Sequence, residues 1–116
     1  MTLLSLSLLG PFRATLAGEP VTGFESNKVR ALLAYLAVEA DRPHSRSTLA
    51  GLLWPELPDR VALTNLRHVL PNLRRAIGDF DGQPSFLLIP RQTVQFNTTS
   101  DYWLDVTRGP SRFERH

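Results

Sequence analysis

The chain has 116 residues, 42% of them hydrophobic and 21% charged, and it contains no cysteine. This length supports one domain that buries roughly two thirds of its unfolded surface, and it is too short for two independent cores. The lack of cysteine excludes disulfides, thiolate zinc sites and cysteine nucleophiles, which suits a reducing cytoplasm. The most hydrophobic stretch, LLSLSLLG at the N-terminus, follows no lysine or arginine and is far shorter than the ~20 residues of a membrane span. We therefore expect a cytoplasmic protein without a membrane partner.

The net charge of +2 is unevenly distributed. Residues 60–78 carry four arginines and no acidic residue, whereas residues 79–107 carry four aspartates and one arginine. One concentrated basic segment is thus followed by an acidic one, and the basic segment is the first candidate for contact with an acidic partner.

Residues 3–22 have the pattern of short strands. Leucines at 4, 6 and 8 alternate with serines, as in a half-buried strand. Gly10-Pro11 and a turn over Gly18-Glu19-Pro20 punctuate the segment. We expect an N-terminal antiparallel sheet that serves as scaffold.

Two helices are predicted next from apolar residues at helical spacing. The first begins after Ser26 as N-cap, covers residues 27–40 and places in the core Val29, Leu32, Leu33, Leu36 and Ala37. The second is shorter, begins after Ser45 and is ended by Pro55 and Pro58. It is expected to bury Leu49, Leu52, Leu53 and Trp54.

The longest helix is predicted between Asp59 as N-cap and Gly78 as the residue beyond its C-terminus. On a wheel at ~100° per residue, its apolar residues lie within about 60° of Leu66: Ala62, Leu63, Val69, Leu70, Leu73 and Ile77. The opposite arc holds Arg60, Thr64, Arg67, His68, Pro71, Arg74 and Arg75. We expect a basic, solvent-facing stripe with no carboxylate in the same segment to pair with it.

Pro71 lies within this helix, on its polar arc. It removes one backbone hydrogen bond and crowds the preceding turn, at a cost of about 3 kcal/mol if the helix stays straight. We expect the helix to kink or restart near residue 70 and to open on its basic face.

The sequence FLLIPRQTVQFN predicts two strands, over 86–89 and 93–96, joined around Pro90, Arg91 and Gln92. The following DYWLDV is expected to pack the end of the chain back on the domain. We therefore predict a domain over residues 1–106 and a tail over 107–116.

The predicted elements have the order found in a winged helix. Two short helices are followed by a long third helix with unpaired arginines and then by a hairpin with Arg91 at its tip. The predicted fold is α+β: an N-terminal antiparallel β-sheet, three helices and a C-terminal β-hairpin wing. In that arrangement the third helix enters the major groove of DNA and the hairpin reaches the neighbouring backbone.

Several stretches resemble the OmpR-like winged-helix domain of SARP-type bacterial transcriptional activators. They are SLLGPFRATLAGEPV, KVRALLAYLAVEADRPHSRSTLAGLLWPELPDRVALTNLRHVLPNLRRAIGD and FLLIPRQTVQFN, within residues 3–106. The resemblance implies sequence-specific binding to double-stranded DNA at direct repeats, often as side-by-side copies, and assistance to RNA polymerase. It also implies that such a domain stands at the front of a longer regulator, before a helical bacterial transcriptional activator domain.

Carried over residue by residue, the recognition-helix positions of the family fall on Arg60, Thr64, Arg67, His68 and Arg75. Its wing tip falls on Arg91 and Gln92, and basic positions of its first helix fall on Lys28 and Arg30, as candidates for structural ion pairs. The chain departs from the family at Pro71, where an ordinary helix former is usual.

From the wheel and the resemblance together, we expect phosphate contacts, with room for one guanine contact, from Arg60, Arg67, Arg74 and Arg75. Base readout is expected to be adjusted by Thr64, Asn65 and His68. Arg91 is expected to hold the DNA backbone from the wing, next to Gln92.

The sequence offers no catalytic or metal-binding constellation. The histidines are expected in a loop (His44), on the basic face (His68) and at the chain end (His116), without carboxylates at ligand spacing. Glycine-rich phosphate loops are missing, and the serines around Arg46 are explained by helix capping. We expect no enzyme activity, no metal and no cofactor.

A second hypothesis is a winged helix used for protein docking, in which the bent basic face meets an acidic partner. The acidic segment Asp79 to Asp105 discriminates between the two hypotheses. Packed under the third helix it would neutralise the arginines, whereas placed elsewhere it leaves the face open to DNA.

Overall fold

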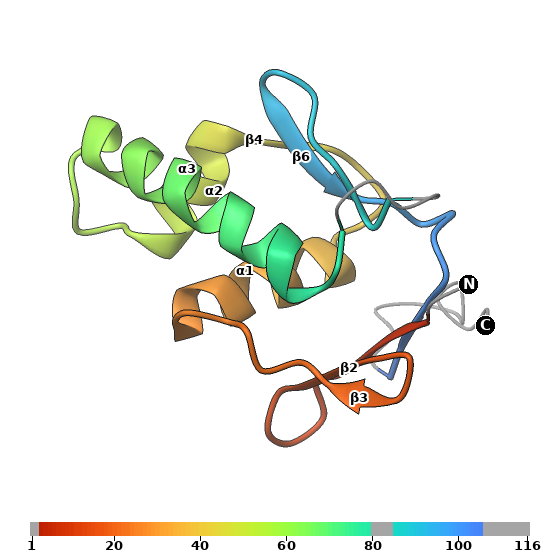
Figure 1. Cartoon of the computed structure of the whole chain (residues 1–116). Helices are drawn as coiled ribbons and strands as arrows, with labels where there is room; N and C mark the ends of the chain where they lie inside the picture. Colours follow the sequence, from red (N-terminus) through yellow and green to blue (C-terminus); the bar gives the residue numbers. More distant parts are fainter. Residues whose placement is uncertain (1–2, 80–84, 106–116) are drawn as a thin grey trace.

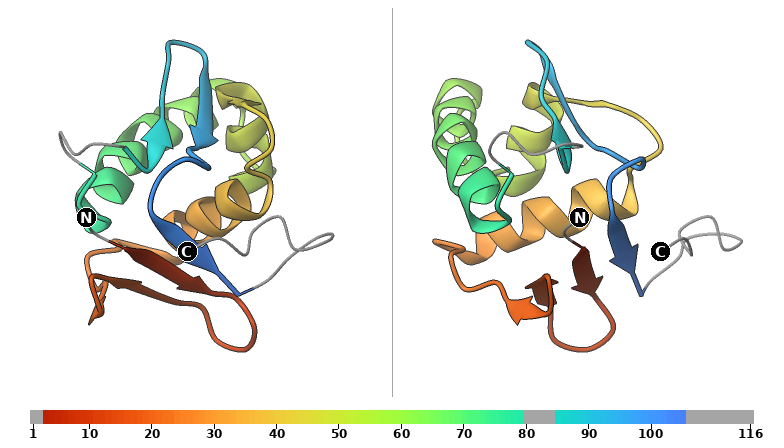
Figure 2. Two further views of the ribbon diagram at one scale, coloured as in Figure 1. Left: turned by 90° about the vertical axis from the view of Figure 1, so that its right-hand side faces the viewer. Right: turned by 45° about the vertical axis from the view of Figure 1, so that its right-hand side comes forward.

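The computed structural model describes residues 3–79 and 85–105. Three helices pack between a four-stranded sheet at one end and a projecting hairpin at the other (Figure 1, Figure 2). The elements are β1 (Leu4–Ser7), β2 (Arg13–Leu16), β3 (Glu19–Pro20), α1 (Asn27–Val38), β4 (His44–Ser45), α2 (Arg46–Leu53), α3 (Asp59–Ala76), β5 (Leu87–Leu88), β6 (Thr93–Phe96) and β7 (Tyr102–Leu104). One cluster of buried side chains joins sheet, helices and hairpin. The predicted tail over 107–116 lies outside the described residues.

The N-terminal sheet has the strand order β3-β2-β1-β7. β1 and β2 are antiparallel, as predicted, with Leu4 and Leu6 fully buried on the core face. The turn between β2 and β3 lies at Ala17 and Gly18, both with positive φ (53° and 85°), rather than at Gly18-Glu19-Pro20. Two central residues with positive φ make the tight turn whose twist suits a hairpin, so Glu19 already belongs to β3.

β7 completes this sheet by pairing in parallel with β1, which the sequence did not predict. Leu4 lies opposite Tyr102, and Leu6 lies opposite Leu104. The expectation that DYWLDV packs back on the domain is therefore confirmed. Tyr102 is 2% exposed, and its ring packs edge-on against that of Phe96.

The first two helices bury the residues that their periodicity predicts, with one exception. All five expected core residues of α1 are buried, as are Leu49, Leu53 and Trp54 in and after α2. Leu52 was expected in the core but is 53% exposed. The short α2 packs inward through Leu49 and Leu53. Leu52 lies about 60° around the helix from Leu49 and about 100° from Leu53, and it lines an apolar groove beside Tyr35.

α3 is one continuous helix through Pro71. Of the two predicted outcomes, a kink or a restart near residue 70, the restart is therefore wrong, while the kink stays a prediction. Its core face is as expected, with Leu63 and Val69 partly rather than fully buried. Pro58 takes the N-cap position, and Asp59, the predicted cap, is the first helical residue. There its carboxylate still lies near the positive end of the helix dipole.

A buried asparagine inside α3 explains how the turn around Pro71 is held. Asn72 is 5% exposed; its Nδ2 donates to the Gly23 carbonyl (3.0 Å) and its Oδ1 accepts from the Glu25 amide (3.0 Å). These bonds fasten the helix to the loop before α1 at the residue next to Pro71. These contacts support a continuous helix at a position where the sequence alone predicts a kink or a restart.

The hairpin consists of β5 and β6, antiparallel and close to the predicted strands, with Leu87 opposite Phe96. β4 pairs with the other edge of β6, through His44 opposite Val94. This small sheet, in the order β4-β6-β5, is the base of the wing. Among the described residues, no helix has the length and apolar character to cross a membrane.

Candidate nucleic-acid interface

The exposed face of α3 carries the predicted basic residues. Arg60, Arg67, His68 and Arg75 are exposed, and Thr64, Asn65 and Arg74 are half-buried beside them. From Arg60 to Arg75 the helix advances about 22 Å, at ~1.5 Å per residue. We call Arg60, Arg67 and Arg75 the arginine stripe. Among residues 3–79 and 85–105, no carboxylate lies within ion-pair distance of any of the three.

Thr64 lies between the arginines on this face. Its hydroxyl donates to the Arg60 carbonyl one turn earlier (3.0 Å). That bond uses the hydroxyl proton and leaves the oxygen as an acceptor toward solvent. In this conformation Thr64 can receive, but not donate, a hydrogen bond from a partner.

Arg74 differs from the stripe because it has a carboxylate partner. Asp79, one residue beyond the basic segment, places Oδ2 3.5 Å from Arg74 Nε. The Nε has no aligned hydrogen-bond acceptor, so the contact is an ion pair rather than a good hydrogen bond. The basic segment 60–78 contains no carboxylate that could pair with its arginines, as expected. The next residue, Asp79, nevertheless neutralises part of the Arg74 charge.

The rest of the described acidic segment lies away from α3. The Asp105 carboxylate accepts hydrogen bonds from the Ser7 hydroxyl (2.7 Å) and the Leu8 amide (2.8 Å), at the sheet end of the molecule. Burial raises the pKa of this carboxyl, but the bonds from Leu8, Ser7 and Leu9 outweigh it and hold the pKa below its usual value. Asp101 precedes β7, and its carbonyl accepts from the Leu4 amide (3.0 Å). In the described part of the segment, contact with α3 is thus made through Asp79, while Asp81 lies outside the described residues.

Arg91 and Gln92 lie in the exposed loop between β5 and β6, as predicted. The Gln92 carbonyl accepts a hydrogen bond from the Arg46 amide (3.1 Å), at the first residue of α2. Ser45 caps α2 as predicted, because its side chain accepts from the Thr48 amide (3.0 Å). The wing loop is thus fastened to the start of α2, and sequence reading assigned no such role to Arg46.

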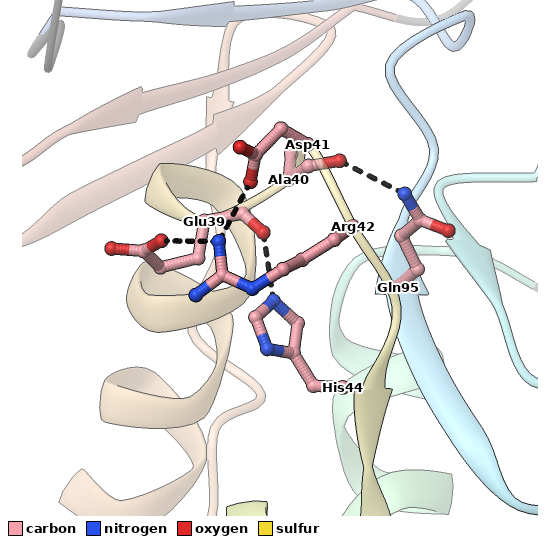
Figure 3. Close-up of polar contacts among 6 residues, drawn as sticks. All are labelled: Glu39, Ala40, Asp41, Arg42, His44 and Gln95. Atoms are coloured by element: carbon pink, nitrogen blue, oxygen red, sulfur yellow. Dashed lines mark hydrogen bonds and ion pairs between the residues drawn. The ribbon is translucent and has the colours of Figure 1, made fainter.

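A cluster of polar contacts fixes the wing base to the end of α1 (Figure 3). Gln95 of β6 donates from Nε2 to the Ala40 carbonyl (3.0 Å), and His44 Nε2 lies 2.7 Å from the Glu39 carbonyl oxygen. The His44 ring also packs edge-on against Tyr35, at 5.1 Å between centroids. His44, expected in a loop, is therefore a buried residue of β4 that positions the wing.

The basic residues of α1 make structural contacts other than the expected ion pairs. Lys28 Nζ donates to the Leu53 carbonyl at the end of α2 and lies 5.9 Å from the centroid of the Trp54 ring. Arg30 lies over the Phe24 ring, with its guanidinium carbon 5.4 Å from the centroid. Both cations thus cover aromatic rings of the core.

The roles of Asn72 and Gln95 could not be predicted from the sequence because their partners lie 47 to 55 residues away along the chain. The partners of Asp79 are near in sequence, but they belong to the helix before it and the strand after it. Asp79 had one available signal: it follows Gly78 directly, where a helix C-terminus often turns the chain back. In the described part of the chain, no group of three or more histidines, aspartates or glutamates could hold a metal ion.

The chain matches no family model. It does match the transcriptional regulatory protein EmbR of Mycobacterium tuberculosis and that of Mycobacterium bovis, each with 34% identity over 85 residues. The chain is homologous to EmbR. The match covers 73% of this chain and 22% of EmbR, so the chain spans about a fifth of the length of the curated relatives it matches.

A solved structure of Mycobacterium tuberculosis EmbR, in complex with a low affinity phosphopeptide, has the same fold in its matching part. The TM-score is 0.69 with 30% identity, over 84% of this chain and 26% of the EmbR chain. The predicted winged-helix fold is therefore confirmed. The relatives bear the name of transcriptional regulators, which agrees with the expectation of a non-enzyme.

Proposed function

We propose that this chain is the sequence-specific DNA-binding domain of a SARP-type bacterial transcriptional regulator. The observation that carries the proposal is the arginine stripe: Arg60, Arg67 and Arg75 are exposed along one helix face, without an ion-pair partner among the described residues. The homology to EmbR, a transcriptional regulatory protein, supports it independently.

In the proposed complex, α3 lies in the major groove, which is wide enough to admit an α-helix. The arginine stripe neutralises phosphates on the groove edges, and one of these arginines is free to reach a guanine. Asn65 has the amide geometry that pairs with adenine. Thr64 offers an acceptor to an exocyclic amine, and His68 lies on the same exposed face.

The wing supplies the second contact. Arg91 and Gln92 are exposed in the β5–β6 loop, and Arg91 would meet the phosphate backbone beside the groove that α3 occupies. Arg74 contributes less to phosphate binding than the arginine stripe, since Asp79 already compensates part of its charge.

Protein docking is the competing function, and the charge arrangement favours DNA over it. An acidic segment packed along α3 would have supported docking, but within the described residues the contact is limited to Asp79 with Arg74. The resemblance to SARP-type activators adds four points to the proposal. The domain would bind direct repeats, bind DNA as side-by-side copies, contact RNA polymerase and act in the cytoplasm.

The test is fluorescence anisotropy with a random-sequence duplex between about 50 and 200 mM salt, a range over which phosphate contacts change affinity steeply. Each neutralised phosphate should steepen the fall of log affinity against log salt by ~0.9, so the stripe and Arg91 predict a slope of about 3 to 4. Arg67→Ala should lower the slope by about one.

The matched control is Arg13→Ala, because Arg13 is also exposed but lies in β2 at the sheet end. It should leave the slope unchanged. Equal slopes for wild type, Arg67→Ala and Arg75→Ala would refute the placement of α3 on DNA.

A further inference from the structure

The corner between α3 and the wing is built around Asp79. Gly78 adopts φ +69° just beyond the helix, its amide donates to the Arg75 carbonyl (3.2 Å), and the Asp79 amide donates to the Arg74 carbonyl (2.8 Å). This pair of bonds is the Schellman ending of a helix. It fixes the backbone of Asp79 to the last turn of α3.

The side chain of Asp79 continues from there into the wing. Its Oδ1 accepts from the Phe86 amide (2.8 Å) and its Oδ2 from the Leu87 amide (3.2 Å). Leu87 begins β5 and lies opposite Phe96 of β6. One carboxylate therefore joins the end of the recognition helix to the first strand of the wing.

The carboxylate is buried, so its charge needs local compensation. The Asp79 side chain is 1% exposed, and Arg74 Nε lies 3.5 Å from Oδ2. A buried carboxylate keeps its charge only when it is paired and hydrogen-bonded. Arg74 and the amides of Phe86 and Leu87 provide that pairing, so in this position Arg74 contributes more to the corner than to the solvent-facing arginine stripe.

We propose that Asp79, supported by Arg74, is a positioning residue that sets the wing relative to α3. β5 is an edge strand of two residues that pairs with β6 alone in the order β4-β6-β5, whereas β6 is also held by β4. The placement of β5 beside the end of α3 therefore needs an anchor of its own, and the Asp79 carboxylate supplies it. The inference rests on the proposed function in one respect: correct placement lets Arg91 on the wing and Arg67 on α3 engage the same duplex.

The first experiment needs no DNA. Asp79→Asn keeps the side-chain shape and one acceptor, but it removes the charge and the second carboxylate oxygen. Amide hydrogen exchange at Phe86 and Leu87 should become about tenfold faster relative to α1 amides. Unchanged relative exchange at both amides would overturn the proposal.

The matched control is Asp105→Asn. Asp105 likewise accepts two backbone amides, those of Leu8 and Leu9, but it lies in the N-terminal sheet. This variant should change exchange at Leu8 while leaving Phe86 and Leu87 unaffected. A similar rise at Phe86 in both variants would mean a general loss of stability and would overturn a specific role of Asp79.

The second experiment asks whether the corner matters for DNA. Arg91→Ala should weaken duplex binding about fivefold in the wild type and in Asp105→Asn, but less than twofold in Asp79→Asn. A merely stabilising Asp79 would leave the effect of Arg91→Ala unchanged, and that result would overturn the proposal. Should Asp79→Asn fail to fold, Arg74→Met removes the ion pair together with the phosphate contact proposed for Arg74. Compared within that variant, the effect of Arg91→Ala should again be smaller than in the wild type.

The two experiments separate failure of this inference from failure of the proposed function. If the wild type binds no DNA, the proposed function is refuted, and hydrogen exchange still decides whether Asp79 sets the wing.

Discussion

Replacing Asn72 by alanine should destabilise the domain without changing the exposed arginine stripe of α3. The substitution removes both side-chain bonds between α3 and the loop before α1, each 3.0 Å long, and leaves the Gly23 carbonyl and Glu25 amide without this partner. Leaving a buried polar group unpaired costs about 1–3 kcal/mol. Because the Glu25 side of the loop is exposed and water can reach it, we expect a total loss of about 2 kcal/mol in the free energy of unfolding.

Urea unfolding followed by far-ultraviolet circular dichroism measures this change, and the same loss should lower the melting temperature by about 8 °C. Asn65→Ala is the matched control, since Asn65 lies on the same helix but makes no side-chain hydrogen bond to a described residue. It should change stability by less than about 0.5 kcal/mol, yet it should alter DNA binding if Asn65 reads a base. A change below about 0.5 kcal/mol for Asn72→Ala would refute the reasoning that these two bonds hold the Pro71 turn.

Three further changes test the fold. Pro71→Ala restores the backbone donor to the Arg67 carbonyl and should raise the free energy of unfolding by about 2 kcal/mol, measured in urea. An unchanged unfolding midpoint would refute the cost assigned to Pro71. Gly78→Ala should lower it by about 1–2 kcal/mol, because alanine strains at φ +69° and its Cβ would lie 3.0 Å from Leu16 Cδ2; an unchanged unfolding midpoint would contradict this. Because the pKa of Asp105 is lower in the folded state than its ordinary value of 3.8, its carboxylate stabilises the folded state at pH values above 3.8. This contribution is lost as the pH falls through the folded-state pKa. In the wild type, this contribution to the free energy of unfolding should be lost below about pH 4. Unfolding curves between pH 7 and pH 2.5 should therefore show a weaker acid dependence for Asp105→Asn than for the wild type.

Local patterns were sufficient for the parts of the fold that depend on neighbours in sequence. The alternation of leucine and serine in β1, the capping of α2 by Ser45 and the core face of α3 around Leu66 all follow from periodicity or short-range hydrogen bonds. The Gly78 ending of α3 likewise needs only the residues of one turn. These are interactions that a short segment specifies by itself.

The parts that failed depend on contacts made across the chain. The continuity of α3 at Pro71 is supported by Asn72 bonding to residues 47 and 49 positions earlier, which no helical pattern encodes. The pairing of β7 with β1 joins the two ends of the domain, and a three-residue strand carries too little pattern to predict it. The exposed arginines were identified by the wheel, but the distinct environment of Arg74 required the position of Asp79.

The parallel pairing of β1 with β7 also orders events during synthesis on the ribosome. The Ser7 and Asp105 side chains, hydrogen-bonded in the finished domain, are 98 residues apart, so β1 and β2 emerge long before their last neighbour exists. Contacts of such separation form late, whereas helices and the hairpin of β1 and β2 form from nearby residues. Until residues 102–104 arrive, the outer edge of β1 is open to pairing with other chains, and a fragment that ends before Tyr102 would keep that edge permanently exposed to aggregation.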